Sequence, residues 1–180
     1  MPNWCENTLR IVPVTDAARA LLPQIAERFI SENESSDLSA FQLIHPMPVE
    51  LEGTVSPGDS PNWYDWRVAN WGTKWQESGP YVVRSLEGEL LVSFQTAWSP
   101  PIGIYRRLCE LGFDVLATYA EGGMGFAGCW ENGNDTEVDL SSLVVMGDDE
   151  EDYPEDFEVL QKAFAGFGLS DEMLPPGLGG

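Results

Sequence analysis

Two stretches of alternating apolar and polar residues, each reversing at a glycine-containing turn, place the strongest constraint on the fold of this chain. The first, in residues 81–98, brings Leu90, Val92 and Phe94 to one face after a Glu-Gly turn. The second, in residues 113–133, alternates on both sides of a Glu-Gly-Gly turn. A period of two is typical of strands with one buried face, and tight turns join such strands in pairs. Each stretch therefore predicts a β-hairpin.

A helix is predicted between the two hairpins. Ser99 is placed to cap its first turn, and Pro100 suits the first helical position, where no backbone N–H is needed. Ile104, Leu108 and Leu111 then recur at helical spacing. A glycine follows this stripe directly and is expected to end the helix.

The first half of the chain carries weaker patterns. Residues 9–14 predict a first strand, and the apolar residues of 18–29 predict a helix that Pro23 is expected to kink or restart. Residues 41–48 predict a packed loop, because two prolines close them. Four tryptophans crowd residues 63–75, but a glycine among them argues against a helix there.

The order strand, helix, strand, strand, helix, strand is that of a split βαβ unit. The predicted fold class is therefore α+β, a ferredoxin-like antiparallel sheet with helices on one face and one or more extra strands. We assign this domain to residues 1–140. Residues 141–180 are predicted to form an acidic C-terminal extension, with a helix near 154–165 where apolar residues again recur at helical spacing.

The charge of the chain is its most unusual bulk property, because 30 acidic and 9 basic residues give a formal net charge of −21. Residues 1–109 hold 13 acidic and 8 basic residues, whereas residues 110–180 hold 17 acidic and 1 basic. A field of this sign repels nucleic acid and steers basic proteins toward the chain. The expected partner is a basic, nucleic-acid-binding host protein, with no direct binding to nucleic acid.

The location of the protein can also be predicted. No apolar run approaches the ~20 residues that span a bilayer, and the first ten residues lack the pattern of a signal peptide. Cys5, Cys109 and Cys129 are odd in number, widely spaced and free of any CxxC motif, as expected of reduced thiols. We therefore expect a cytoplasmic protein with no membrane partner. Exposed sheet edges would suit a homodimer.

Few residues suggest catalysis or metal binding. His45 is the single histidine, so neither a nucleophilic triad nor an ordinary zinc site has enough candidate residues. Glu121 could act as a general acid or base if burial raised the pKa of its carboxyl group, but no second catalytic group is spaced to help it. No Walker-type phosphate loop occurs. We expect a protein that is not an enzyme and has no cofactor and no metal.

Four motifs occur in an order and spacing that resemble one known group of proteins. They are MPNWCENTL at 1–9, NWGTKW at 70–75, FQTAWSPP at 94–101 and YAEGGMGFAG at 119–128. They resemble the YubB-like (Api92-like) ferredoxin-like family of accessory proteins carried on bacterial plasmids and phages. The resemblance covers roughly residues 1–130 and implies the same fold. It implies no catalytic residues, since the family is functionally uncharacterised.

Two sets of residues are candidate binding sites. An acidic run can imitate a row of phosphates, since duplex DNA carries one charge per ~1.7 Å of its axis, or it can be an ordinary solvated surface. A Trp-rich pocket can take a base, a sugar or a cation, unless these aromatic residues pack in the core. The acidic set is Asp148, Asp149, Glu150, Glu151, Asp152, Glu155, Asp156 and Glu158, and the pocket set is Trp4, Asn70, Trp71, Lys74, Trp75, Trp98 and Glu121.

The sequence thus predicts a non-enzymatic acidic binding protein of a mobile element. The first hypothesis is a nucleic-acid mimic that inhibits a host defence protein, of the anti-CRISPR or anti-restriction type. The alternative is a ferredoxin-like module that binds a protein or a small ligand through the Trp-rich pocket, with the charge serving only solubility.

Overall fold

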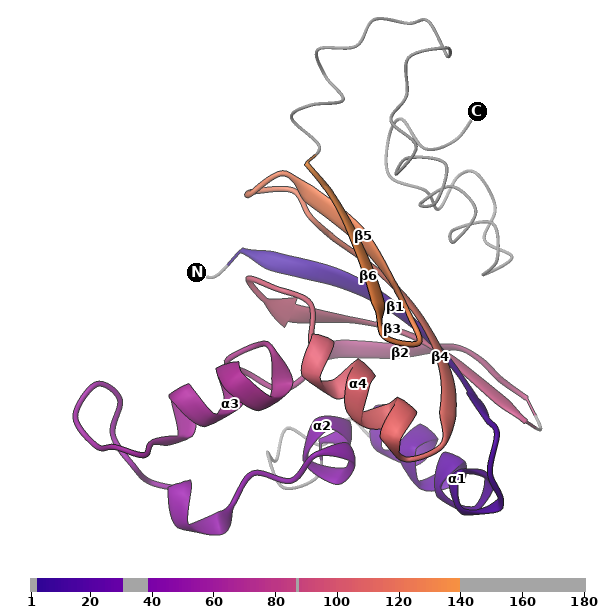
Figure 1. Cartoon of the computed structure of the whole chain (residues 1–180), viewed down its shortest axis with the longest axis horizontal. Helices are drawn as coiled ribbons and strands as arrows, with labels where there is room; N and C mark the ends of the chain where they lie inside the picture. Colours follow the sequence, from indigo (N-terminus) through magenta and orange to yellow (C-terminus); the bar gives the residue numbers. More distant parts are fainter. Residues whose placement is uncertain (1–2, 31–38, 87, 140–180) are drawn as a thin grey trace, which may run out of the picture.

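A computed structural model of the chain describes residues 3–30, 39–86 and 88–139 (Figure 1). These residues form six strands, four α-helices and one short 3-10 helix. The strands are β1 (Trp4–Pro13), β2 (Ser78–Leu86), β3 (Glu89–Ala97), β4 (Phe113–Glu121), β5 (Phe126–Glu131) and β6 (Asn134–Asp139). The helices are α1 (Asp16–Ile30), α2 (Ala40–Ile44), η2 (Val49–Leu51), α3 (Trp63–Trp71) and α4 (Ile102–Glu110).

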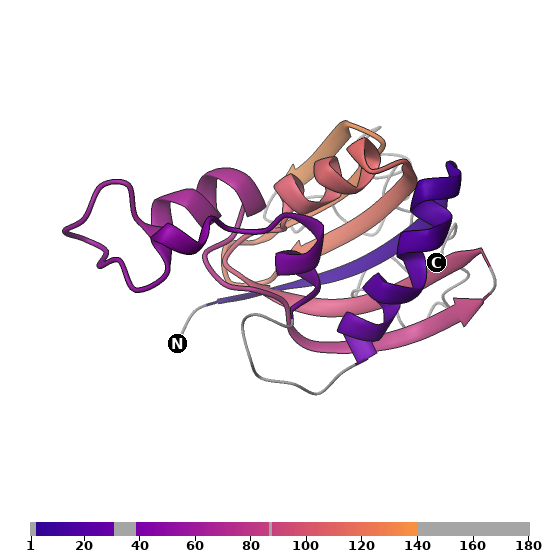
Figure 2. The same ribbon diagram turned by 90° about the horizontal axis from the view of Figure 1, so that it is seen from below.

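The six strands form one antiparallel sheet in the order β2-β3-β1-β4-β5-β6. In the middle of β1, Leu9 stands opposite Val92 of β3 and Ala117 of β4. The helices lie on one face of this sheet (Figures 1 and 2). Both predicted hairpins are confirmed, the first as β2 and β3 and the second as β4 and β5.

The period of two along β1 separates the two faces of the sheet. Leu9 and Ile11 are fully buried on the face that the helices cover. On the opposite face the Nε of Arg10 pairs with a carboxylate oxygen of Glu89 at 3.1 Å. The strand is therefore apolar toward the helices and polar toward the other side, as an antiparallel strand covered on one face should be.

Aromatic rings join the helices to the sheet. Phe94 of β3 packs against Phe29 of α1, with ring centroids 5.6 Å apart, and against Phe41 of α2, at 5.7 Å. Phe41 in turn meets Trp71 of α3 edge to face at 5.8 Å. All four rings are at most 1% exposed. Since fully burying such rings is the largest apolar gain available to a chain, this contact series anchors three helices on one strand.

A buried amide ties β1 to β3 and α4. Asn7 is 2% exposed, and its Nδ2 donates to Oγ1 of Thr96 at 2.9 Å and to the carbonyl oxygen of Cys5 at 2.8 Å. Its Oδ1 accepts from the hydroxyl of Tyr105 on α4 at 2.9 Å. A buried amide left without partners is destabilising, so these hydrogen bonds hold the three elements in one relative position.

The helix predicted between the hairpins is present as α4, but it begins two residues later than predicted. Pro101 is its N-cap residue and makes no side-chain cap. Ser99, predicted to cap the helix, instead donates from its Oγ to the carbonyl oxygen of Gly72 at 2.6 Å. The predicted apolar stripe is confirmed in Ile104 and Leu108, which are fully buried.

Two α-helices, α2 and α3, lie between α1 and β2, where the sequence predicted a packed loop and argued against a helix. The side chain of Ser39 caps α2 by accepting from the N–H of Gln42 at 3.0 Å. α3 ends at Gly72, whose φ of +89° is readily adopted only by glycine. The glycine that argued against a helix is therefore the residue that ends it. α1 runs through Pro23 as one helix.

The prediction of a ferredoxin-like sheet is wrong, although the α+β class is correct. A simple ferredoxin-like unit has four strands and two helices, whereas the described residues form a six-stranded sheet with four α-helices. The chain inserts α2 and α3 before β2 and continues after β4 through β5 and β6. The limits of the predicted domain, 1–140, stay a prediction. The predicted acidic extension at 141–180, with its helix near 154–165, lies outside the described residues.

α4 packs closely on the end of α3 because it has a glycine at the contact. A Cβ atom on Gly103 would lie 1.9 Å from the carbonyl oxygen of Asn70 and 2.6 Å from its carbonyl carbon. Both atoms belong to the backbone, so no change of rotamer relieves the overlap. The contact therefore sets the distance between α4 and the last turn of α3.

Substitution of Gly103 by alanine is expected to lower the free energy of unfolding by about 2 kcal/mol, because overpacking forces the backbone apart. Helix propensity alone would predict the opposite change in the free energy of unfolding, because alanine is the better helix former. Gly122→Ala is the matched control, because a Cβ there meets no atom within 4 Å. Urea denaturation measures both variants, and an unchanged midpoint for Gly103→Ala would contradict the close contact.

Candidate functional site

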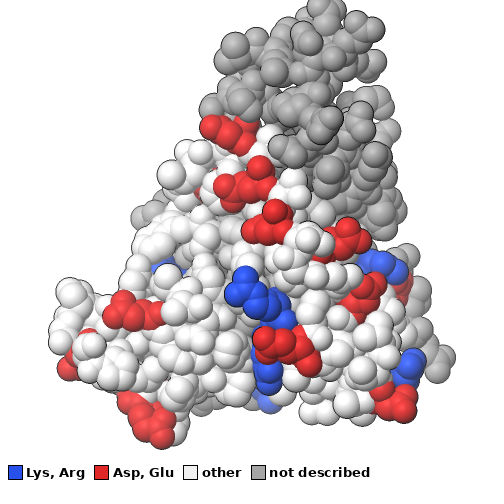
Figure 3. All heavy atoms as spheres, in the orientation of Figure 1, with Lys and Arg blue, Asp and Glu red and all other residues white. Residues whose placement is uncertain are grey.

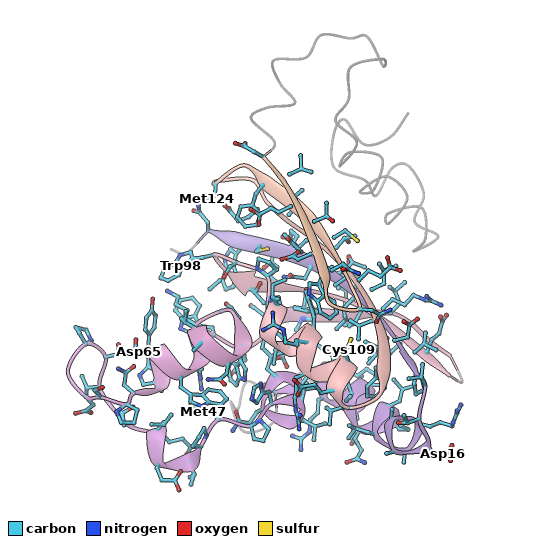
Figure 4. The ribbon with its side chains drawn as sticks, viewed as in Figure 1. Asp16, Met47, Asp65, Trp98, Cys109 and Met124 are labelled. Carbon is cyan, nitrogen blue, oxygen red and sulfur yellow. The ribbon has the colours of Figure 1, made fainter. Side chains whose placement is uncertain are left out.

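Aromatic side chains from three segments meet at one end of the sheet. β1 begins there with Trp4, β3 continues there into Trp98, and the chain after α3 adds Lys74 and Trp75. We call these four residues the aromatic cluster. Trp98 is 45% exposed and Trp75 is 37% exposed. Figure 4 shows Trp98 at this end of the molecule, together with the exposed Met124.

Lys74 contacts two indole rings of the aromatic cluster. Its Nζ is 3.9 Å from the ring centroid of Trp75 and 3.6 Å from that of Trp98. The ring of Trp4 lies beside that of Trp75, with 6.2 Å between centroids. An ammonium group over an indole face is attracted by the ring quadrupole, by about 0.5–1 kcal/mol at an exposed position. The cluster is therefore a set of mutual contacts rather than four separate surface residues.

Trp98 has a backbone conformation that bulky residues rarely adopt. Its φ is +72°, in the left-handed region, which costs of order 1–3 kcal/mol for a non-glycine residue. The N–H of Trp98 donates to the carbonyl oxygen of Asn3 at 3.0 Å. Nearby, the hydroxyl of Thr73 donates to the carbonyl oxygen of Ala97 at 3.0 Å. These hydrogen bonds hold Trp98 in place and join the segment that carries Lys74 to the end of β3.

Glu77 anchors the other end of the segment that follows α3. Its two carboxylate oxygens accept from the backbone N–H groups of Ala40 and Phe41, at the start of α2. Burial raises the pKa of Glu77 to about 7, and these hydrogen bonds only partly oppose the effect of burial. Residues 72–77 are thus tied to β3 at one end and to α2 at the other.

The pocket set predicted from the sequence divides into separate places. Four of its residues form the aromatic cluster. Trp71 is 1% exposed and belongs to the core, where it packs against Phe41 and its Nε1 donates to the carbonyl oxygen of His45 at 2.8 Å. Asn70 donates from its Nδ2 to the carbonyl oxygen of Trp66 at 2.8 Å. These two residues stabilise α3 and do not line the exposed cluster.

Glu121, the last member of the pocket set, is buried in the turn between β4 and β5. It is 2% exposed, and its carboxylate accepts from the backbone N–H of Gly123 at 2.8 Å and from that of Met124. Both carboxylate oxygens are therefore engaged in holding the turn. This arrangement favours a structural role for Glu121 over general acid or base catalysis.

The cysteine and histidine side chains are not arranged as activated nucleophiles. Burial raises the pKa of Cys5 to about 12 and the pKa of Cys129 to about 11, so both are protonated thiols at neutral pH. Burial lowers the pKa of His45, whose ring meets Trp66 edge to face. Within residues 3–30, 39–86 and 88–139, no three His, Cys, Asp or Glu side chains are grouped as metal ligands. No helix in these ranges is both long and apolar enough to cross a membrane.

β6 carries a row of carboxylates that the sequence reasoning missed. Asp135, Glu137 and Asp139 are exposed and alternate along this edge strand, so they share one face. Strand geometry sets successive members roughly 7 Å apart. We call these residues the acidic row. Figure 3 shows acidic groups along the upper part of the described surface, where Figure 1 places β5 and β6. The alternation in NDTEVD could have revealed the row.

The acidic set that the sequence predicted lies elsewhere in the chain. All of its members, from Asp148 to Glu158, lie outside the described residues. The acidic row precedes them, on the last described strand.

The described residues define an α+β protein with a six-stranded antiparallel sheet and an exposed aromatic cluster at one end of it. No family model matches the chain, and no curated protein matches it. A crystal structure of protein api92 from Yersinia pseudotuberculosis, of the DUF1281 family, is similar with 11% sequence identity and a TM-score of 0.44. The match covers 77% of this chain and 98% of that chain. A likeness of this degree carries no argument about the family or the function of this chain.

The pKa of Glu77 predicts a pH dependence of stability. The carboxyl group titrates near pH 7 in the folded chain and near 4.5 when unfolded, so between these values the folded chain binds more protons. The free energy of unfolding is therefore expected to fall as pH rises from 4.5 through 7, by at most about 3 kcal/mol.

Urea titrations at a series of pH values measure this effect in the wild type and in Glu77→Gln, which cannot titrate. The variant is expected to lose the slope between pH 4.5 and 7, whatever its absolute stability. Glu50→Gln is the control, because Glu50 is exposed. Equal slopes in all three proteins would contradict the raised pKa of Glu77.

Proposed function

We propose that this chain is a non-enzymatic binding protein whose negative surface recognises a basic, nucleic-acid-binding protein. The observation that carries the proposal is the acidic row of Asp135, Glu137 and Asp139 on an exposed edge strand. The net charge of −21, most of which residues 110–180 carry, strengthens the same field. A field of this sign raises the encounter rate with cationic proteins and lowers it with nucleic acid.

In its specific form, the proposal is that the chain occupies the nucleic-acid groove of a host defence protein, of the restriction or CRISPR type, and inhibits it. Carboxylates at roughly 7 Å intervals offer a basic groove a regular series of charges, as a phosphate backbone does. Ten further acidic residues and a single lysine follow Asp139 in the sequence. The motifs that resemble accessory proteins of plasmids and phages support a role of this kind.

Residue chemistry supports binding rather than catalysis. The thiols of Cys5 and Cys129 have raised pKa values. Both carboxylate oxygens of Glu121 accept hydrogen bonds from backbone N–H groups of a turn. Neither arrangement provides a nucleophile with an adjacent base, which covalent catalysis requires.

Capture of partners from a host cytosol tests the proposal. The tagged full chain is expected to retain a basic, nucleic-acid-binding protein at about 0.05 M salt and to release it at about 0.5 M, because salt screens the charges. The variant Asp135→Asn, Glu137→Gln, Asp139→Asn, which neutralises the acidic row, is expected to weaken binding at least about tenfold.

The matched control removes three exposed carboxylates elsewhere, by Asp16→Asn, Glu50→Gln and Glu52→Gln. It has the same net charge as the first variant and is expected to bind nearly as well as the wild type. If both variants lose the same amount of binding, net charge and not the position of the acidic row determines recognition. Partner binding that changes neither with salt concentration nor in either variant would overturn the proposal.

A second candidate function is recognition of a protein or small ligand by the aromatic cluster, with the charge serving only solubility. The exposure of Trp75 and Trp98 favours it, because exposed tryptophans are frequent anchors of binding surfaces. Under this alternative, Trp75→Ala abolishes partner capture without unfolding the chain. Trp71→Ala, in contrast, is expected to cost about 3–5 kcal/mol of stability, because Trp71 is in the core. Circular dichroism and urea denaturation separate the two effects.

A further inference from the structure

The aromatic cluster already holds a cation, and that cation belongs to the chain itself. The ammonium group of Lys74 lies within 4 Å of the ring centroids of both Trp75 and Trp98. Among the ion pairs of the described residues, none includes Lys74. Within the described residues, two indole faces are therefore the partners of this charge.

Contacts other than those of Lys74 also hold the two tryptophans. Trp98 is fixed at a φ of +72° by the hydrogen bond to Asn3, and strain of this kind persists only where surrounding structure imposes it. Trp75 is supported on one side by the ring of Trp4. Removal of the Lys74 ammonium would thus free two indole faces whose ring centroids both lie within 4 Å of the same Nζ atom.

We propose that Trp75 and Trp98 form a cation-binding cleft that takes a lysine or arginine side chain of a partner protein, and that Lys74 is its internal competitor in the free chain. The distances of 3.9 and 3.6 Å are those of an ammonium group held over indole rings. A guanidinium group is planar and weakly hydrated, so it stacks on aromatic faces at least as well as an ammonium group does.

The charge of the chain favours this class of occupant over a nucleotide. A stacked base would bring its phosphate into the field of a chain with a net charge of −21, which repels anions, whereas a cationic side chain is attracted by it. The claim that the cation comes from a basic partner protein rests on the proposed function. The cleft itself rests on the geometry of Lys74 and the two indoles.

Competition by Lys74 gives the inference a distinctive test. Nα-acetylarginine amide is titrated into the full chain at constant ionic strength, and the indole N–H resonances of Trp75 and Trp98 are followed by NMR. Lys74→Met, which keeps an unbranched apolar stem without the charge, is expected to bind the probe about tenfold more tightly than the wild type, because an attached competitor acts at a high effective concentration. Arg19→Met is the control for the lost charge, since Arg19 is exposed on α1.

Ring variants complete the test. In the Lys74→Met background, Trp98→Ala is expected to abolish probe binding and Trp98→Phe to retain part of it. Tyr81→Ala controls for loss of an exposed aromatic ring, because Tyr81 is 57% exposed on β2. Far-UV circular dichroism checks that each variant is folded, and the phenylalanine variant keeps the test decisive if the alanine variant does not fold.

Three outcomes would overturn the inference. They are equal or weaker probe binding by Lys74→Met, full binding by Trp98→Ala, and tighter binding of adenosine monophosphate than of the arginine probe. The last outcome would identify a nucleobase site instead. The probe assay contains no partner protein, so the cation cleft can stand if partner capture fails, and partner capture can stand if the cleft fails.

Discussion

The buried amide of Asn7 is the constraint on which the rest of the structure depends. It must find partners on β3 and on α4 at once, and it does so through Thr96 and Tyr105. A shift of β1 by one residue would turn this amide to the other face of the sheet, together with every apolar side chain of the strand. The register that satisfies Asn7 also sets Trp4 opposite Ala97. The position of the aromatic cluster is thus a consequence of a hydrogen bond inside the core.

The sequence predicted the elements whose pattern is local and failed where tertiary contacts decide. Alternation over residues 81–98 and 113–133 predicted both hairpins, and the stripe through Ile104 predicted α4. The predicted start of α4 was wrong because the hydroxyl of Ser99 donates to the carbonyl oxygen of Gly72 instead of capping the helix. No local pattern reveals this contact. The segment before β2 was missed because α2 and α3 are short and end at residues typical of loops. Without those helices and β6, the order of elements suggested a simpler sheet than the one that forms.

The candidate site was predicted in composition but not in arrangement. Tryptophans 71 and 75 are four residues apart, and only the end of α3 at Gly72 separates them into core and surface. Spacing alone cannot make that distinction, because it depends on where the helix stops. The acidic row of β6 was missed for a different reason. Its alternation was visible in NDTEVD, but Val138 is the only apolar residue of this strand, too little to mark a buried face. The strand forms because β5 provides the hydrogen-bonding edge.

The acidic row also governs how two copies of the chain can meet. A strand at the edge of a sheet has unpaired backbone groups that can bind the strand of another copy, about 4.8 Å away. If β6 met the β6 of another copy, six carboxylates would be brought within a few ångströms of each other, and like charges directly opposite destabilise a strand pair. The acidic row therefore opposes pairing of two copies through this edge. A homodimer of the kind expected from exposed sheet edges would have to use another surface.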